Sequence, residues 1–306
     1  MTAHTKIAVV VLNYNSAAFT LRCIESLRRH TAAPVTVNVV VVDNNSAPAD
    51  KKLLATIRPG TATLVWSERN LGFAGGMMLG ARSVQAEYYF FLNNDCEFLN
   101  DVLSILTQFM EAHAEAALCS ASMFDADDRP RSSFGYLPSL ALMILGAAVL
   151  RLFQPRRYPR RHRLYRTPVE VPVVTGAAMF VRGSVLWQLS GLDTAYFLYC
   201  EEEDFAWRIR QAGRKVYHVP QARIRHVGGA SSGQPELQAA LQREYYISLF
   251  RFLRSQHGAV YAFALRLLVA TKILRRALLG RMPFGLLGFV LRGAPENRSL
   301  RYRQNQ

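Results

Sequence analysis

Four consecutive acidic residues, Glu201-Glu202-Glu203-Asp204, stand in a strongly basic part of the chain. The 306 residues include 37 Lys and Arg against 22 Asp and Glu, a formal net charge of +15. Residues 131–306 contain only 9 acids, so nearly half of that region's carboxylates belong to one short run. Adjacent carboxylates raise one another's pKa, and burial raises it further. Such a cluster suits a general base, a cation site, or both.

The members of the run have separate candidate roles. Asp204 and Arg208 are four residues apart, the spacing of an ion pair on a helix, which predicts a structural role for Asp204. Some of the other acids could complement the positive end of a helix, but three carboxylates exceed what that requires. One of them, with its pKa held up, could deprotonate a sugar hydroxyl that attacks a phosphate-activated carbon.

Two further carboxylates directly follow apolar runs. Asp43 could accept hydrogen bonds from a nucleobase or a ribose hydroxyl, although a strand-ending Asp often only caps a turn. Asn93-Asn94-Asp95 places one carboxylate beside amide oxygens, a combination that suits a hard divalent cation with substrate phosphates as its other ligands. Read as a turn, the same triplet needs no ligand.

A glycine-rich segment and one histidine complete the chemically interesting positions. Residues 70–76, Asn-Leu-Gly-Phe-Ala-Gly-Gly, match neither the phosphate-binding P-loop nor the dinucleotide fingerprint. They predict either a close approach of a helix start to an anion or tight packing of a helix on a sheet. His226, beside Gly228, could ligate a cation or donate to a phosphate, although an isolated histidine usually does neither.

The elements that must position these residues follow from the hydrophobic pattern. Continuous apolar runs predict buried strands over residues 7–12, 37–42, 63–66 and 88–92. Helical spacing separates them, as from Ser16 to Leu27 and from Gly72 to about Ala86. The alternation predicts an α/β fold with a mostly parallel central sheet flanked by helices. Ligands of such sheets bind beyond the carboxyl ends of the strands, where the polar clusters converge.

Charge divides the chain into two parts. Residues 1–130 have a net charge of −3 and residues 131–306 a net charge of +18, an asymmetry that indicates a polyanionic partner. No recognised nucleic-acid-binding motif accompanies the charge, so the prediction is an anionic membrane surface and no nucleic acid.

Two apolar segments of the basic part bear on the membrane prediction. Leu140–Leu150 is too short to span a bilayer and is followed by six arginines between residues 156 and 166. It is either a buried core helix or, as we predict, a segment lying in a membrane surface. The stretch from Val260 to Arg292 mixes Arg and Lys with Leu, Phe and Val. It suits anionic headgroups and a polyprenyl-diphosphate acceptor, with a solvated cationic helical face as the alternative.

The expected location is the cytoplasm, with peripheral attachment to the inner face of the plasma membrane. The first residues lack the pattern of a secretory signal. The four scattered cysteines, Cys23, Cys96, Cys119 and Cys200, are expected to be reduced thiols.

Taken in order, these segments resemble the family 2 inverting glycosyltransferases of the GT-A fold. The resemblance covers about residues 5–255 and is greatest to the bacterial rhamnosyltransferase-like branch, which extends lipid-linked or cell-surface glycans. Its motifs are residues 9–15, 41–46, 70–76, 92–95, 174–179 and 191–193, then 199–204 with Arg208, and His226 with Gly228, Gly229 and Ser231.

The resemblance implies a role for each matching position. Glu202 would be the catalytic base, with Glu201 as the second choice, and Asp95 and His226 would bind Mg²⁺ or Mn²⁺ on the donor diphosphate. The implied nucleotide-sugar-binding residues are Leu12, Asn13, Asn15, Asp43, Asn45, Asn70, Gly72, Gly75, Asn94, Asp95 and Gly176.

Three departures from the family pattern stand out. Glu202 is a glutamate where many members have aspartate, and Asn93-Asn94 replaces a more acidic metal motif, which implies a weaker metal dependence. Met77-Met78 stands where relatives often have asparagine.

The expected organisation is a GT-A catalytic domain over residues 1–235, with a membrane-facing insertion at about 137–168, and a basic helical region over 236–306. The expected reaction moves a sugar from a nucleotide-diphosphate sugar, with dTDP-rhamnose as the first guess, to a lipid-linked or cell-surface glycan. The alternatives are a non-catalytic nucleotide-sugar-binding or nucleic-acid-binding protein, and a sugar-phosphate nucleotidyltransferase that releases pyrophosphate.

Overall fold

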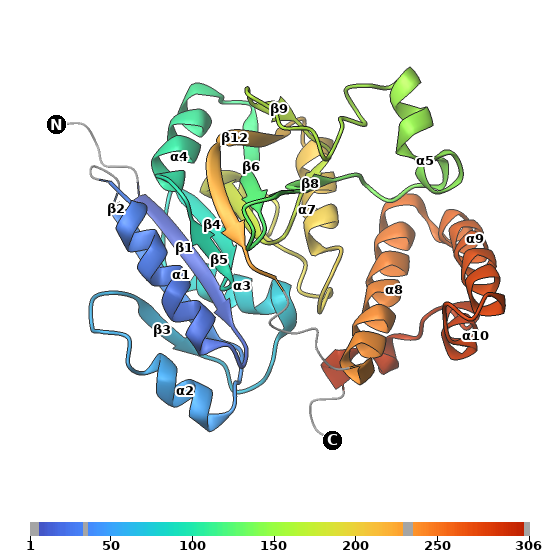
Figure 1. Cartoon of the computed structure of the whole chain (residues 1–306), viewed down its shortest axis with the longest axis horizontal. Helices are drawn as coiled ribbons and strands as arrows, with labels where there is room; N and C mark the ends of the chain where they lie inside the picture. Colours follow the sequence, from blue (N-terminus) through green and yellow to red (C-terminus); the bar gives the residue numbers. More distant parts are fainter. Residues whose placement is uncertain (1–5, 33–35, 229–234, 303–306) are drawn as a thin grey trace.

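A computed structural model describes residues 6–32, 36–228 and 235–302 of the chain. A twisted central sheet has helices on both faces, and a group of helices from the C-terminal part lies to one side (Figure 1).

The first half of the sheet is parallel, as the sequence predicts. Its strands are β1 (Lys6–Asn13), β2 (Thr36–Asp43), β3 (Thr63–Trp66) and β4 (Tyr88–Asn93), in the spatial order β3-β2-β1-β4. The connecting helices are α1 (Ala17–His30), α2 (Pro48–Leu54) and α3 (Gly72–Arg82). Asn13 is in register with Asp43, and Leu12 with Asn93, so the carboxyl ends of β1, β2 and β4 share one edge.

The second half of the sheet mixes strand directions. β11 (Ala178–Arg182) runs antiparallel to β4 and to β6 (Ala116–Phe124), and β12 (Lys215–His226) runs parallel to β6. The short β5 (Cys96–Phe98) is antiparallel to β12 and forms the far end of the sheet. β7 (Pro130–Arg131) and β9 (Val169–Glu170) pair at its margins, while β8 (Phe134–Gly135) and β10 (Val173–Val174) form a separate ribbon. The predicted parallel order therefore holds for β1 to β4 and gives way beyond β4.

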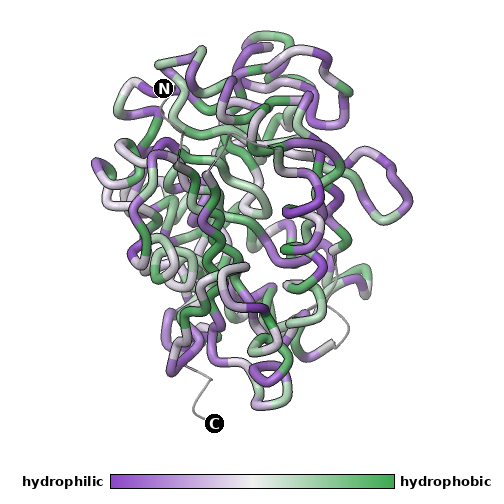
Figure 2. Tube along the Cα trace, turned by 90° about the vertical axis from the view of Figure 1, so that its left-hand side faces the viewer, coloured by the Kyte–Doolittle hydropathy of each residue, from purple (hydrophilic) through white to green (hydrophobic). Residues whose placement is uncertain are grey.

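Two hydrophobic cores lie on opposite faces of the sheet. Val9 and Val11 pack with α1 and α4 (Val102–Ala112), whereas Ala8 and Val10 pack with α3, α6 (Gly183–Gln188) and α7 (Glu201–Gln211). This alternation along one strand explains why β1 is apolar at every position from Ile7 to Leu12. Hydrophobic stretches accordingly run through the interior of the molecule and hydrophilic ones are commoner around them (Figure 2).

The C-terminal helices form a third core against the preceding part of the chain. They are α8 (Pro235–His257), α9 (Ala259–Leu278) and α10 (Phe284–Leu291), followed by the 3-10 turns η1 (Glu296–Arg298) and η2 (Leu300–Tyr302). Their buried side chains cluster with Tyr196 and Cys200, which directly precede the acidic run. The basic helical region thus packs beside the segment that positions the carboxylates.

Helix α5 (Leu140–Phe153) is not a buried core helix, so that alternative is wrong. Leu150 is its only buried residue, and Gly146, at φ +75°, breaks the helix into two parts. α5 is tied to α9 by the Leu140 N–H, which donates to Tyr261 Oη at 2.7 Å, and by Lys272 Nζ, which donates to the Met143 carbonyl at 2.6 Å. Across the described ranges, no helix combines the length and hydrophobicity that crossing a membrane requires.

Candidate active site

Asn13 is the centre of a buried polar network at the ends of β1 and β2. Its side-chain amide lies 3.1 Å from Asp43 Oδ1, 3.0 Å from Ser46 Oγ and 2.7 Å from Asp50 Oδ2. The other oxygen of Asp43, Oδ2, accepts from the Ser46 N–H at 3.1 Å. Asp43 is almost fully buried, and its hydrogen bond with the Ser46 N–H closes the turn after β2.

Asn94 extends this network to β4. Its amide donates to Ser16 Oγ at 2.7 Å and to Thr20 Oγ1 at 2.9 Å, and lies 3.4 Å from Asn13 Oδ1. The exposed Asn15 and Asn45 border the network with backbone φ of +51° and +66°. Asn15 Oδ1 accepts from the Ala47 N–H at 2.7 Å, and Asn45 Oδ1 accepts from Lys51 Nζ at 3.1 Å. Predicted nucleotide-sugar residues from three strands thus lie together.

The glycine-rich segment is held mainly by internal packing. Asn70 Oδ1 accepts from the Gly72 N–H at 2.8 Å, and the Phe73 N–H donates to the Phe197 carbonyl at 2.7 Å. A Cβ on Gly72 would lie 2.1 Å from that carbonyl oxygen, and one on Gly75 would lie 2.8 Å from the Cβ of Leu71. Leu12 packs against Gly76 in the same way. Tight helix packing, one of the two predicted explanations, accounts for these glycines.

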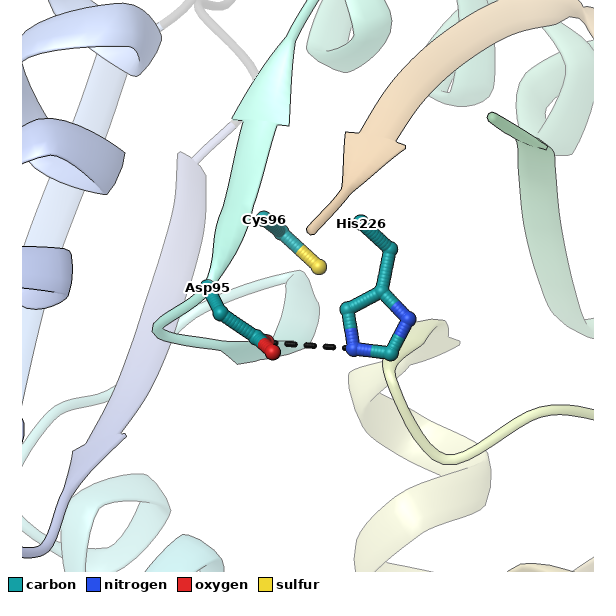
Figure 3. Close-up of side chains that lie close together, drawn as sticks. All are labelled: Asp95, Cys96 and His226. Carbon is teal, nitrogen blue, oxygen red and sulfur yellow. Dashed lines mark ion pairs between the residues drawn. The ribbon is translucent and has the colours of Figure 1, made fainter. Parts of the chain in front are cut away.

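Asp95, in the turn between β4 and β5, and His226, at the end of β12, approach each other, as Figure 3 shows. His226 Nε2 lies 3.1 Å from Asp95 Oδ1, and Cys96 Sγ completes a group whose ligand atoms are all within 4.8 Å of one another. Gly229 and Ser231, which follow His226 in the motif, lie outside the described residues. The two residues predicted to share a metal ion are therefore adjacent in space.

The donor set at this point fits a hard or borderline divalent cation. A carboxylate and an imidazole are ligands of Mn²⁺-type and Mg²⁺-type sites that leave room for phosphate oxygens. Burial raises the pKa of the Cys96 thiol well above its ordinary value, and Sγ lies 3.6 Å from the Ala177 carbonyl. Cys96 is thus a neutral thiol, a poor ligand. All four cysteines are free and buried.

Glu202 lies at the start of α7 against Gly176. A Cβ at Gly176 would lie only 3.3 Å from Glu202 Oε1, so the Glu202 carboxylate packs directly against the Gly176 backbone. The next residue, Ala177, has a carbonyl that accepts from the Asn93 N–H at 2.9 Å. Glu202 is therefore near the end of β4, and Asp95 lies in the turn that follows this strand.

The three glutamates of the run are unequal. Burial raises the pKa of all three, and the mutual repulsion adds to it for Glu201 and Glu203, whose values rise well above the ordinary range. The covered Oε2 atom of each of the three glutamates has no hydrogen-bond partner among the described residues.

The predicted ion pair between Asp204 and Arg208 is confirmed. Arg208 Nε donates to Asp204 Oδ2 at 2.7 Å, and its Nη2 donates to the Gly191 carbonyl at 2.9 Å. Asp204 Oδ1 also accepts from Gln256 Nε2 of α8 at 2.8 Å. The two residues anchor α7 to the preceding loop and to the C-terminal helices.

Several positions in the network were not predicted from the sequence. Asp50 accepts from Asn13 and from the Ala17 N–H at 2.8 Å, and Asn44 joins Asn70 to Gly72 through hydrogen bonds of 2.9 and 3.0 Å. Asn44 follows Asp43 in the motif of residues 41–46, and this position was the only feature of the sequence that pointed to a role in the network. Asp50 lies inside a short helix and has no motif around it.

The amino-acid sequence is similar to those of known glycosyltransferases. The model of the family described as Glycosyl transferase family 2 matches residues 8–190. An N-acetylglucosaminyl-diphospho-decaprenol L-rhamnosyltransferase of Mycobacterium tuberculosis is 27% identical over 275 residues, 84% of this chain and 87% of the relative. Rhamnosyltransferase WbbL of Escherichia coli is 26% identical over 141 residues, 45% of this chain and 52% of that protein.

Solved structures share the fold at lower identity. GalNAc-T7 with UDP, GalNAc and Mn²⁺ superposes with a TM-score of 0.61 at 14% identity, covering 83% of this chain and 48% of that one. The mannosyltransferase PcManGT of Pyrobaculum calidifontis, with GDP-Man and Mn²⁺, gives 0.58 at 17% identity, covering 99% and 83%.

Proposed function

Because the chain belongs to glycosyl transferase family 2, we propose that it transfers a sugar from a nucleotide-diphosphate sugar to an acceptor hydroxyl with inversion, and that Glu202 is the base. The observation that carries the proposal is the position of Glu202. Its carboxylate packs against Gly176, and the neighbouring Ala177 carbonyl accepts from the Asn93 N–H at the end of β4, just before the turn that contains Asp95.

The proposed chemistry is a single displacement. Glu202 takes the proton of the acceptor hydroxyl, the acceptor oxygen bonds to the anomeric carbon, and the bond from that carbon to the diphosphate oxygen breaks with its electron pair. A base whose pKa lies nearer to neutrality accepts this proton more readily, and burial raises the pKa of Glu202 in that direction. Glu201 is the second candidate, and burial together with repulsion by Glu202 raises the pKa of its carboxyl group as well.

We propose that the nucleoside end of the donor lies over the turns after β1 and β2. Asp43 Oδ1 and Oδ2 each accept one protein hydrogen bond, and a carboxylate oxygen can accept a second one. The exposed Asn15 and Asn45 stand on either side. The remaining positions, Asn70, Gly72 and Gly75, would shape this pocket through the backbone of the loop before α3.

Asp95 and His226 would hold a divalent cation, Mg²⁺ or Mn²⁺, which supplies charge neutralisation for the departing diphosphate. Their side chains already converge, so a cation would need little rearrangement at these two ligands. Two solved structures of similar fold contain Mn²⁺, which supports a metal of this kind.

The proposed donor is dTDP-rhamnose and the proposed acceptor a lipid-linked glycan. Support comes from the Mycobacterium tuberculosis relative, whose name specifies rhamnosyl transfer to a diphospho-decaprenol carrier, and from the rhamnosyltransferase of Escherichia coli. A polyprenyl carrier would keep the acceptor at a membrane surface.

We further propose that the protein lies peripherally on the inner face of the plasma membrane. Helix α9 buries one apolar stripe in the third core and exposes a second one on its outer side. The exposed stripe has helical spacing and consists of Val260, Phe263, Leu267, Leu274 and Leu278. An amphipathic helix with basic neighbours such as Lys272 and Arg275 suits an anionic surface.

Substitution of Glu202 by Gln tests the catalytic proposal. We expect kcat/KM to fall by about 100-fold or more, because proton transfer is lost while shape is kept. The wild-type rate should also fall as pH decreases through the raised pKa of Glu202, since the protonated base is inactive. Donor binding should persist in a thermal-shift titration with dTDP-rhamnose.

A matched control is Glu25→Gln, a surface change on α1 that should leave the rate unaltered. Unchanged turnover in Glu202→Gln would remove this residue from the mechanism. The product separates the alternatives. Release of the nucleoside diphosphate supports transfer, release of pyrophosphate indicates a nucleotidyltransferase, and binding without turnover indicates a non-catalytic protein.

A further inference from the structure

A large basic pocket lies between the 151–172 segment and the end of α7. Its volume is about 1080 Å³. Seven of its lining residues are Arg or Lys, and Glu170 is the only acid among its lining residues. We call this feature the basic pocket. Cations that line a concave surface concentrate positive potential, so the pocket favours an anion.

The walls of the basic pocket are built by fixed contacts. Arg151 Nε donates to the Tyr158 carbonyl at 2.7 Å, and its Nη2 donates to Tyr136 Oη at 3.2 Å. Arg210 and Lys215 both approach Glu170, at 3.4 and 3.8 Å. The acid of the pocket is therefore already neutralised by two of its cations.

Three arginines of the basic pocket have no such partner. Arg156, Arg157 and Arg160 are exposed, and none has a carboxylate within 4.0 Å among the residues that the structure describes. Three guanidinium groups offer many N–H donors, and their planar geometry matches phosphate oxygens.

The basic pocket is separate from the candidate active site. Trp207 and Arg210, which line it, lie on the last turns of α7, whereas Glu202 is in the first turn. Eight residues of helix separate Glu202 from Arg210, a distance of roughly 12 Å along the axis. Asp95, His226 and Glu202 are not among the residues that line the basic pocket.

Large apolar side chains border the basic pocket. The side chains of Leu152 and Phe153 are 79% and 77% exposed, and in the sequence these two residues stand between the lining residues Arg151 and Pro155. Leu164, which follows the lining residue Arg163, is 66% exposed. An anion site with an apolar border matches an amphipathic ligand that joins a phosphate to hydrocarbon. Figure 1 shows α5, which carries Leu152, on the same side of the molecule as α9.

We infer that the basic pocket binds the phosphate headgroup of an anionic membrane lipid, with Leu152 and Phe153 in the acyl region. This inference rests on the proposed membrane association and adds a defined headgroup site to it. The pocket would fix which face of the protein meets the bilayer, so the acceptor approaches the active site from one direction.

The test uses the full chain with Arg156, Arg157 and Arg160 all changed to Gln. The matched control changes three exposed cations on the opposite side, Arg28, Lys52 and Arg58, to Gln. Binding is measured by co-sedimentation with vesicles of phosphatidylcholine alone and of equal parts of phosphatidylcholine and phosphatidylglycerol. Since each cation at an anionic surface contributes about fivefold, we expect the pocket variant to bind mixed vesicles about 100-fold more weakly. The control should change by less than about fivefold.

A soluble probe separates a lipid site from a free-phosphate site. We expect short-chain phosphatidylglycerol to bind the wild type, measured by calorimetry, more tightly than inorganic phosphate does, and the pocket variant to lose this difference. Equal loss of vesicle binding in pocket variant and control would overturn the headgroup site while leaving membrane association intact. No vesicle binding by the wild type would overturn both, and tighter binding of single-stranded RNA than of mixed vesicles would identify a different ligand.

Discussion

At the scale of single residues, the acidic run places the proposed base, Glu202, among carboxyl groups whose burial opposes folding at neutral pH. Burial raises the pKa of Glu203 well above its ordinary value, and repulsion by Glu202 adds to the rise. A carboxyl group whose pKa is higher in the folded than in the unfolded state favours folding below the unfolded value. That contribution is lost as pH rises through the folded value.

This argument makes Glu203→Gln a stabilising change at neutral pH. The amide cannot ionise but can still donate to Glu202, so the variant should gain about 1 kcal/mol at pH 7 and much less near pH 4, where the wild-type carboxyl is protonated. Denaturant unfolding at the two pH values measures the difference, and kcat should change little. An equal gain at both pH values would show that ionisation of Glu203 is not the cause.

At the scale of elements, Gly72 joins α3 to the loop that precedes the acidic run. Its φ is +74°, and a Cβ would lie 2.1 Å from the Phe197 carbonyl oxygen. We expect Gly72→Ala to lower the free energy of unfolding by about 2 kcal/mol or more, because the conformation and the contact are both unfavourable. The matched control is Gly60→Ala, at φ +79° with no atom within 4 Å of its Cβ position. If both variants unfold at the same temperature, the Phe197 contact is unimportant.

The strands and helices that the sequence predicted are those with a continuous local pattern. Residues 63–66 were predicted as a strand and form β3. β6 was not predicted, because its sequence AALCSASMF consists largely of small residues with low strand preference. The antiparallel direction of β11 could not be predicted from the sequence either, since a strand has the same hydrophobic periodicity in a parallel and in an antiparallel pair.

The site followed the same logic. The ends of β1, β2 and β4 could be brought together by topology alone, which is how Asn13, Asp43 and Asn94 were found. The proximity of His226 to Asp95 depends on β5 pairing with β12, in which His226 faces Cys96. That pairing joins segments more than a hundred residues apart, and only the resemblance to a family pointed to it.

At the scale of the whole molecule, charge and exposed apolar surface occur together in the second half of the chain. The first half has a net charge of −3 and holds the proposed nucleotide contacts, whereas the second has a net charge of +18 and holds α5, α9 and α10. Such a division lets one face meet an anionic bilayer while the donor enters from the other side.

The exposed stripe of α9 gives this arrangement its test. Leu267 and Leu278 are 45% and 70% exposed, so Leu267→Ser with Leu278→Ser should leave the unfolding temperature nearly unchanged. If both side chains enter the bilayer, each contributes about 1 kcal/mol, and the double variant should bind mixed phosphatidylcholine and phosphatidylglycerol vesicles about 30-fold more weakly. Leu53→Ser on α2, where Leu53 is 39% exposed, is the matched control and should bind as the wild type does. Because added salt weakens ionic contacts but not apolar ones, binding of the double variant should become undetectable at a lower salt concentration than binding of the wild type. Identical vesicle binding by wild type and double variant at every salt concentration would mean that α9 does not enter the membrane, and that the basic residues alone attach the protein.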